Sequence, residues 1–276
     1  MSPLRLVIIT DIDGTLIDQE TYSYESSLPA ISRLLSLKIP LVLCSSKTRA
    51  EIMRLRKELD LKDPFIAENG GAIYAPMGYF PFPLTGFTSA GTFRSFELGT
   101  RVSKLRQVLN DTASHCHVRV KFFGSMSVEQ IAALTGLTPE QATLAREREY
   151  GEPFLVEGKN QDKLIRALIG KGFSVTSGDR FFYLTGNHDK GKAVKILLDL
   201  YRRVEPKMTS VGIGNSPNDF PLLCQVDRPV LVRKSDGSWD SEVTQKLPLV
   251  ERTEARGPLG WREAIEKTLI TTAKSR

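Results

Sequence analysis

The chain has 276 residues, of which 41% are hydrophobic and 25% charged, as is ordinary for a folded globular protein. No apolar run approaches the roughly 18 residues that a membrane span needs, so we expect no membrane association. The formal net charge is +6 and the pI about 9.2, but the basic residues are dispersed among acidic ones, as in Arg146-Glu147-Arg148-Glu149. No basic stripe is interleaved with aromatic residues, so we expect no nucleic-acid partner.

The N-terminal region and the cysteines favour a cytoplasmic protein. The first apolar run meets Asp11 too early for a signal peptide. Cys44, Cys116 and Cys224 lie far apart among apolar neighbours, which fits reduced thiols better than a disulfide framework.

The stretch Val7–Leu16 reads V-I-I-T-D-I-D-G-T-L and predicts a buried strand that ends in two carboxylates. Asp11 and Asp13 are two residues apart, so an extended backbone starts them on one face, and Gly14 lets the chain turn away. Two converging carboxylates repel unless a hard cation compensates them. The motif alone leaves two interpretations about equally open: an acidic turn after a strand, or a phosphoryl-transfer site with Asp11 as nucleophile and Asp13 as acid and base.

The next predicted elements are a helix over residues 26–37 and a buried strand over 40–44. That strand ends in Ser45-Ser46-Lys47-Thr48, and the spacing of Thr48 and Glu51 predicts a capping box at the start of a second helix. Hydroxyl groups before a helix N-terminus are suited to a phosphate. Alone, however, the run is more typical of helix capping.

A third strand is predicted over residues 65–67, followed by Glu68-Asn69-Gly70-Gly71 and an apolar segment at 72–75. This alternation of strands and helices predicts a parallel sheet covered by helices. Prolines and glycines then cluster between residues 76 and 86, which indicates a domain boundary. We expect residues 83–184 to form an inserted α+β unit, with strands at 93–98, 118–123, 154–156, 173–176 and 181–184 and helices at 101–109, 128–134, 140–150 and around 164–169.

The α/β pattern resumes with a helix opened by Asp189-Lys190 and a strand at 210–214 that leads into Asn215-Ser216-Pro217-Asn218-Asp219. A strand at 229–232 and a terminal helix follow. The predicted fold class is therefore α/β, with a Rossmann-like parallel sheet from residues 1–82 and 185–276 interrupted by the inserted unit.

Polar groups of complementary kinds follow the strands of this predicted sheet. In open parallel sheets, ligands bind beyond the carboxyl ends of the strands, so these groups are expected to meet. Phosphoryl transfer needs positioning and charge compensation, which a hydroxyl, a cation and an acidic loop supply. A lysine in the first turn of a helix opposes the helix dipole, a cost that an anionic ligand reverses. The residues are Asp11, Asp13, Ser45, Lys190, Asn215, Asn218 and Asp219.

In that order, these motifs resemble those of haloacid dehalogenase-type phosphatases, and the insertion resembles the α+β cap of the Cof-type sugar phosphatases. More narrowly, the chain resembles the mannosyl-3-phosphoglycerate phosphatases over nearly its whole length. The narrower resemblance lies in softer stretches: Ser45–Glu51, Glu68–Gly71, Arg148–Phe154, Gly178–Phe181, Asp189–Ala193 and Asn218–Leu222.

The resemblance implies a Mg²⁺-dependent phosphatase that works through an aspartyl-phosphate. It implies Asp11 as nucleophile and Asp13 as general acid and base. Ser45, Lys190 and Asn218 are implied to hold the phosphoryl group. Mg²⁺ is implied to bind Asp11, the backbone carbonyl of Asp13, and the loop that carries Asn215 and Asp219.

Two positions depart from the family pattern. Asn215 stands where an aspartate is usual; its amide oxygen still offers a ligand, but one negative charge is missing, so weaker metal binding or a larger share for Asp219 is expected. Tyr183 stands where a histidine is expected in the cap, which leaves the contacts to the sugar open.

Other residues give weaker indications of a metal or substrate site. His115-Cys116-His117 suggests zinc, but in the strand expected there Cys116 faces away from the histidines and no second ligand pair follows, so we expect no metal site. Lys47 and Asn69 lie near strand ends and are candidates for substrate binding.

Three arginines of the inserted unit could pair with a substrate carboxylate. For Arg146 and Arg148 we favour the alternative of solvated helix charges. Arg180 has apolar, strand-like neighbours, so we favour substrate binding for it.

We therefore predict an enzyme that hydrolyses mannosyl-3-phosphoglycerate, or a close glycosyl-3-phosphoglycerate, to mannosylglycerate, a compatible solute, and phosphate. The partner is a small phosphorylated sugar acid, and the chain is expected to be a monomer or small homo-oligomer. The alternatives are another Cof-type sugar-phosphate phosphatase and a catalytically weak phosphate-binding or regulatory protein, which Asn215 would favour.

Overall fold

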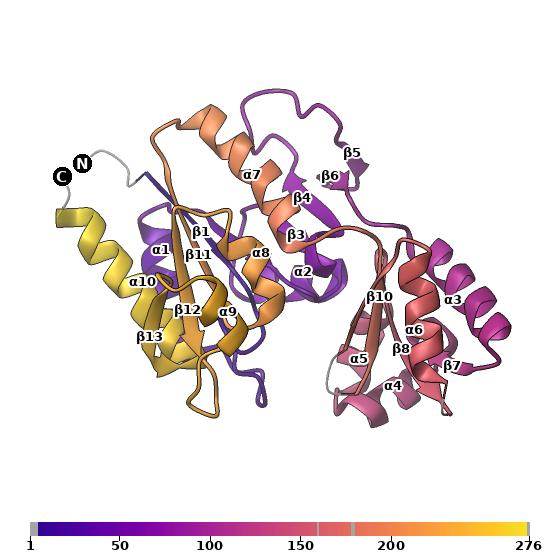
Figure 1. Cartoon of the computed structure of the whole chain (residues 1–276). Coiled ribbons are helices and arrows are strands. Elements are labelled where there is room, and N and C mark those ends of the chain that lie inside the picture. Colours follow the sequence, from indigo (N-terminus) through magenta and orange to yellow (C-terminus); the bar gives the residue numbers. More distant parts are fainter. Residues whose placement is uncertain (1–4, 159, 178–179, 275–276) are drawn as a thin grey trace.

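The computed structural model describes residues 5–158, 160–177 and 180–274 and separates them into two parts (Figure 1). One is built on a nine-stranded sheet and the other on a four-stranded sheet. None of the helices in these residues is long and apolar enough to cross a membrane. We call the two parts the core and the cap.

The core sheet begins as a parallel sheet and ends as an antiparallel one. Its order is β13-β12-β11-β1-β2-β3-β4-β6-β5, with parallel pairing from β13 to β3 and antiparallel pairing from β3 to β5. Strand β1, which lies between β11 and β2, is buried along its whole length. The strands are β1 (Leu6–Thr10), β2 (Leu41–Cys44), β3 (Phe65–Ala67), β4 (Ala72–Pro76), β5 (Thr88–Ala90), β6 (Phe93–Glu97), β11 (Thr209–Gly214), β12 (Arg228–Arg233) and β13 (Glu251–Arg256).

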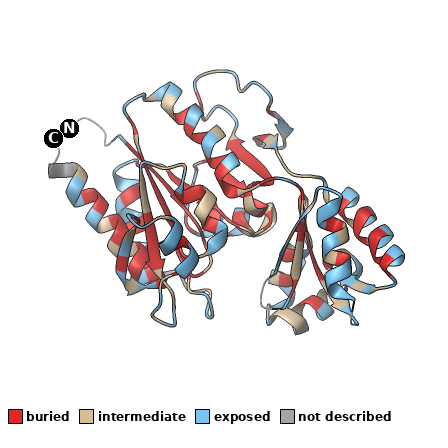
Figure 2. Ribbon diagram, in the orientation of Figure 1, coloured by how far each residue is buried: buried red, intermediate tan, exposed pale blue. Residues whose placement is uncertain are grey.

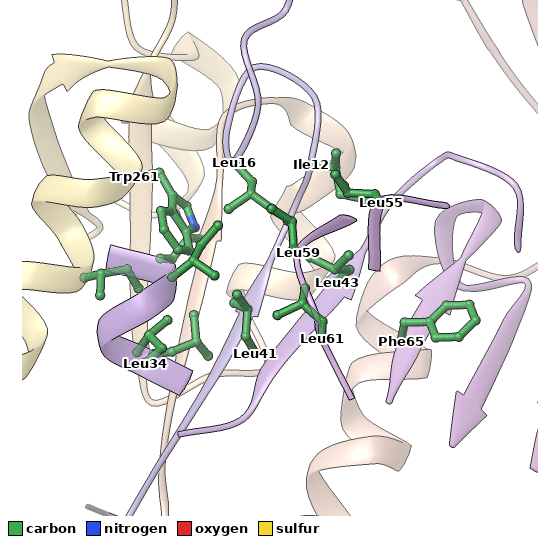
Figure 3. Close-up of a cluster of buried hydrophobic side chains, with 14 of the residues drawn as sticks. Ile12, Leu16, Leu34, Leu41, Leu43, Leu55, Leu59, Leu61, Phe65 and Trp261 are labelled. Atoms are coloured by element: carbon green, nitrogen blue, oxygen red, sulfur yellow. The ribbon is translucent and has the colours of Figure 1, made fainter. Parts of the chain in front are cut away.

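Each face of this sheet carries its own hydrophobic cluster, because successive side chains of a strand point to opposite faces. Ile8 of β1 packs with Trp261 on one face, whereas Val7 and Ile9 pack with Leu197 on the other. Figure 3 shows the first cluster, with Trp261 near Leu16. The core helices are α1 (Leu28–Ser36), α2 (Arg49–Glu58), α7 (Lys190–Val204), α8 (Phe220–Leu223), α9 (Ser241–Lys246) and α10 (Gly257–Lys274), with short 3-10 turns η1 (Glu25–Ser27), η2 (Glu68–Gly70) and η4 (Pro217–Asp219).

The cap sheet is antiparallel, in the order β7-β8-β10-β9. One cluster joins it to α3 and α6, and another joins it to α4 and α5. Figure 2 shows the outward faces of α3 and α6 exposed and their inward faces buried. The elements are α3 (Val102–Cys116), β7 (Arg119–Phe122), η3 (Phe123–Ser125), α4 (Val128–Thr135), α5 (Pro139–Arg146), β8 (Gly151–Glu157), α6 (Gln161–Gly170), β9 (Ser174–Ser177) and β10 (Phe182–Thr185).

The structure moves the start of the insertion. The sequence placed it at residue 83, but β5 and β6 pair with β4 in the core sheet. The glycine- and proline-rich segment is therefore a loop within the core. The chain leaves the core sheet only after Glu97, the last residue of β6.

Two local predictions were also wrong. The helix expected over residues 140–150 ends at Arg146, so the residues before β8 are not helical. His115 and Cys116 belong to the last turn of α3 and His117 is its left-handed C-cap, so these three residues do not alternate along a strand. In the described part of the chain, no group of three or more His, Cys, Asp or Glu residues is placed to hold a metal ion.

Candidate active site

A buried lysine lies between two buried carboxylates beyond the carboxyl ends of the central strands. Lys190 Nζ donates to Asp11 Oδ1 and to Asp219 Oδ1, both at 2.6 Å. The side chains of Lys190 and Asp219 are fully buried, and that of Asp11 is 7% exposed. The structure thus brings together three predicted residues, from the segment directly after β1, from α7 and from the turn after β11.

Local bonds fix each member of this group. Asp11 N–H donates to Ile213 O at 2.9 Å, which continues the pairing of β1 with β11 beyond the strand end. Lys190 is the first residue of α7, whose N-cap Asp189 accepts from Lys192 N–H. Asp219 uses its second oxygen, Oδ2, to accept the backbone N–H groups of Asn215 and Ser216 at 2.9 and 3.1 Å.

The charges of this group perturb one another. Burial is the largest cause that raises the pKa of Asp11, to about 7, and Asp219 raises it further, while Lys190 opposes both. Burial disfavours the charged form of Lys190, but Asp11 and Asp219 outweigh this and hold the pKa of the ammonium above its ordinary value. Because one ammonium faces two carboxylates, the group keeps an affinity for further positive charge.

The neighbouring oxygens suit a hard cation. Asn215 Nδ2 donates to the backbone carbonyl of Asp13 at 3.2 Å, so the amide and that carbonyl lie within reach of one another. A half-turn of the amide would present its oxygen instead, since the two ends of an amide differ only in their hydrogen bonds. Carboxylate, carbonyl and amide oxygens are the donors that Mg²⁺ and Ca²⁺ prefer. The donor set therefore fits a hard divalent cation, with one carboxylate fewer than if residue 215 were an aspartate.

Asp13 is paired with a lysine that the sequence assigned to substrate binding. Lys47 Nζ lies 2.9 Å from Asp13 Oδ1 and 3.7 Å from Glu51 Oε1. It also lies 5.4 Å from the centre of the Tyr22 ring. Burial alone would lower the pKa of Lys47, but Asp13 and Glu51 raise it above the ordinary value. Lys47 therefore stays charged and holds the Asp13 carboxylate in place.

The segment after β2 caps helix α2 and also carries Ser45, the predicted phosphate contact. Thr48 and Glu51 form the expected capping box at the start of α2. Ser45 is fully buried; its hydroxyl accepts from Lys47 N–H at 3.2 Å and its carbonyl accepts from Asn69 N–H at 2.8 Å.

Asn69 and Asn218, both predicted ligand-binding residues, come from different loops and touch. Asn218 Nδ2 donates to Asn69 Oδ1 at 3.4 Å, and Ser216 Oγ donates to Asn218 Oδ1 at 2.5 Å. This pair continues the polar surface outward from the buried lysine.

A cleft of about 990 Å³ lies over these residues and between core and cap. Asp11 and Asn218 line it, whereas Ser45 and Lys190 lie behind its lining. The residues from the cap that line it include Phe123, Leu134, Arg148, Arg180, Phe181 and Tyr183.

Two arginines reach the cleft from the cap in different ways. Arg180 is exposed and donates to the Leu134 carbonyl at 2.6 Å. Arg148, which the sequence left as a solvated helix charge, lies beyond the end of α5, is 10% exposed, and donates to the core carbonyl of Ser46 at 2.7 Å. Its Nε is buried without a hydrogen-bond partner. Arg146, at the end of α5, is exposed.

Lys234 and Arg256 of the core also line the cleft, and the sequence analysis did not single them out. For Lys234 the available signal was its position after the strand predicted at 229–232, because ligands bind beyond the carboxyl ends of parallel strands. The strand that ends at Arg256, β13, was not predicted from the sequence. Gly178, one of the residues that carry the narrower resemblance, lies outside the described residues.

A family model for haloacid dehalogenase-like hydrolases matches residues 8–79. The chain is 39% identical to a glucosyl-3-phosphoglycerate/mannosyl-3-phosphoglycerate phosphatase of Methanococcoides burtonii, over 95% of this chain and 96% of that protein. It is 42% identical to a mannosyl-3-phosphoglycerate phosphatase of Pyrococcus horikoshii, over 83% and 90% of the two chains. The chain belongs to this phosphatase family.

Solved structures agree with the fold. A haloacid dehalogenase-like hydrolase from Bacteroides thetaiotaomicron superposes with a TM-score of 0.66 at 18% identity, over 95% of this chain and 98% of that one. A subclass IIB sugar phosphatase of the same superfamily superposes with a TM-score of 0.64 at 13% identity, over 96% and 99%. Through its full-length relatives the protein is a haloacid dehalogenase-type phosphatase, and membership of that superfamily implies a divalent metal.

Proposed function

We propose that this phosphatase hydrolyses mannosyl-3-phosphoglycerate, or its glucosyl counterpart, to the glycosylglycerate and phosphate. The observation that carries the proposal is the position of Asp11, paired with Lys190, in a cleft whose rim holds Arg148, Arg180 and Lys234. A substrate with both a phosphate and a carboxylate suits such a basic rim. The names of the full-length relatives point to the same substrate class.

In the proposed reaction, an Asp11 carboxylate oxygen attacks phosphorus and the ester oxygen leaves, taking a proton from Asp13. Water then attacks the aspartyl-phosphate, and Asp13 takes a proton from it as phosphate is released and Asp11 is restored. Lys47 positions the side chain of Asp13 for both steps. Ser45, Lys190 and Asn218 are the proposed contacts of the phosphoryl oxygens.

We propose Mg²⁺ as the metal, held by Asp11, the carbonyl of Asp13, Asn215 and Asp219. When bound, it would neutralise charge on the phosphoryl oxygens. Because Lys190 and two N–H groups already occupy the oxygens of Asp219, Asn215 would be the more direct ligand of the two. The neutral amide predicts weaker metal binding than an aspartate would give.

Arg148 is the proposed contact for the glycerate carboxylate. It is nearly buried in the cleft wall, and its Nε is a donor that lacks a partner. A guanidinium can bind a carboxylate with two parallel hydrogen bonds, which fixes direction as well as charge. Arg180, which is exposed, would add charge at the rim.

The test is phosphate release with Mg²⁺ from mannosyl- and glucosyl-3-phosphoglycerate and from a panel of sugar phosphates. We expect the glycosyl-phosphoglycerates to give the highest kcat/KM. Preference for simple sugar phosphates would instead make the chain a general sugar phosphatase. Binding without turnover, which the missing charge at Asn215 would favour, would identify a phosphate-binding protein.

A further inference from the structure

A buried carboxylate outside the reaction centre joins the core to the cap. Glu68 belongs to η2, and its side chain is 2% exposed. Its Oε1 accepts from the backbone N–H of Glu149 at 2.7 Å, and its Oε2 accepts from the backbone N–H of Tyr150 at 3.0 Å. Both acceptors on one side chain of the core are thus used by adjacent amides of the cap.

The same turn contacts both segments of chain that connect core and cap. Gly71 O accepts the N–H groups of Leu98 and Gly99 at 2.9 and 2.8 Å, on the outgoing connection. On the returning connection, His188 Nε2 lies 3.1 Å from Glu68 O. Any rotation of the cap about these connections must therefore change the contacts that they make with this turn.

The turn also contacts the segment after β2 that carries Ser45 and Lys47. Glu68 N–H donates to Lys47 O at 3.0 Å, and Asn69 N–H donates to Ser45 O at 2.8 Å. Glu68 and Asn69 both have positive φ, of 50° and 56°, an unusual backbone conformation for residues other than glycine. Such strained residues persist where the surrounding structure determines their conformation, which here the bonds to Lys47 O and Ser45 O help to do.

We propose that Glu68 is a positioning residue that docks the cap on the core in the arrangement in which Arg148 meets the substrate. Arg148 directly precedes the two amides that Glu68 binds. Its guanidinium reaches the core at Ser46 O, and its Nη1 lies 4.0 Å from Glu68 Oε2, so Glu68 also pairs with the Arg148 side chain itself. Glu68 thereby acts on selectivity for substrates that contact the cap, and not on chemistry at Asp11.

The test compares a substrate that spans the cleft with one that does not. Glu68→Gln keeps the size of the side chain but turns one acceptor into a donor, which faces an amide N–H. We expect kcat/KM for the glycosyl-phosphoglycerate to fall about 10- to 100-fold, the loss of one hydrogen bond to a charged group. For acetyl phosphate, which is too small to contact the cap, we expect a change of less than about threefold.

Glu152 supplies a matched control. It is also a fully buried glutamate, but it accepts from Gly124 N–H at 2.9 Å and from Arg106 Nε at 2.5 Å, both within the cap. Glu152→Gln should lower the melting temperature and leave the ratio of the two kcat/KM values unchanged. Equal losses on both substrates in Glu68→Gln, or none on either, would overturn the proposal.

A second variant tests the same contact if Glu68→Gln does not fold. A Cβ at Gly71 would lie 2.5 Å from Tyr150 Cβ, so Gly71→Ala pushes the cap away while Glu68 stays intact. The φ of Gly71 is −59°, which alanine adopts without strain. Gly71→Ala should lower kcat/KM selectively for the large substrate; an unchanged ratio would contradict the proposal.

This inference rests on the proposed function, which supplies its large substrate. Amide hydrogen exchange therefore serves as a second readout, which needs no substrate. Amide exchange of the peptide that contains Glu149 and Tyr150 should be at least about tenfold faster in Glu68→Gln than in wild type. It should be unchanged in Glu152→Gln. If wild type does not turn over glycosyl-phosphoglycerates, the proposed function fails, yet exchange still decides the role of Glu68.

Discussion

The two walls of the cleft are built differently. On the core wall, Lys190 and Asp219 are fully buried, and Lys190 is bonded to both Asp219 and Asp11 within the core. On the cap wall, Arg180 is exposed and donates to one backbone carbonyl. The core wall therefore suits chemistry that requires fixed positions, whereas the cap wall suits substrate selection. The predictions that follow test this division in order of decreasing effect.

The largest effect is expected at the proposed nucleophile. Asp11→Asn should lower phosphate release by about 10⁴-fold or more on every substrate, because the amide is not a nucleophile. Phosphate release from both a large and a small substrate measures it, and thermal unfolding checks that the variant is folded. A residual rate within tenfold of wild type would remove Asp11 from the mechanism.

Removing the buried ammonium group of Lys190 should lower the stability of the fold. Lys190→Met leaves Asp11 and Asp219 buried without their shared partner, which should cost roughly 3 kcal/mol or more of unfolding free energy. Denaturant unfolding measures this cost. Lys192→Met is the matched control, since Lys192 lies in the same turn but is 46% exposed. Similar losses in the two variants would mean that the buried ion pairs contribute little.

On the cap wall, the effect should depend on the substrate. Arg148→Met should lower kcat/KM for the glycosyl-phosphoglycerate by about 10- to 100-fold, since a charge-assisted hydrogen bond is lost. Acetyl phosphate should be hydrolysed at nearly the wild-type rate. Arg146→Met, which changes an exposed arginine two residues away, should change neither. Steady-state kinetics on both substrates distinguish these outcomes.

The smallest effect is a pH dependence of stability in the metal-free protein. The pKa of Asp11 is about 7 in the folded chain, above its ordinary value, mainly because of burial and then Asp219. Between about pH 4 and pH 7, Asp11 therefore holds a proton in the folded state that the unfolded chain has released. The stability that this proton binding contributes is fully present below about pH 4 and is lost as pH rises through 7.

In EDTA, the melting temperature of the wild type should therefore fall more between pH 5 and pH 8 than that of Asp11→Asn. Added Mg²⁺ should raise it more at pH 8, because the metal competes with the proton. If the melting temperatures of the two proteins changed in parallel with pH, Asp11 would not titrate in this range.

Local sequence signals predicted much of the core. The apolar run before Asp11, the capping box at Thr48, and the alternation of strands and helices from β1 to β3 appear in the structure as expected, whereas β5, α9 and β13 were not predicted. These features depend on residues close together in the chain. The site roles of Asp11, Asp13 and Lys190 remain predictions, although the structure places Lys190 against Asp11.

The errors arose where distant contacts decided the outcome. Nothing in residues 146–150 marks the end of a helix, yet α5 ends at Arg146 and Glu68 takes the N–H groups of Glu149 and Tyr150. Arg148 is consequently turned into the cleft instead of toward solvent. Likewise, β5 and β6 appeared to follow a domain boundary, but pairing with β4 returns them to the core.

By itself, the sequence determined which side chains stand at the strand ends, because a strand, its turn and the next helix are specified by neighbouring residues. Only the tertiary structure decided what these side chains face. Lys190 and Asp11 are 179 residues apart, and Glu68 and Tyr150 are 82 apart. The burial that raises the pKa of Asp11 and the bonds that dock the cap exist only once such separated segments are packed together.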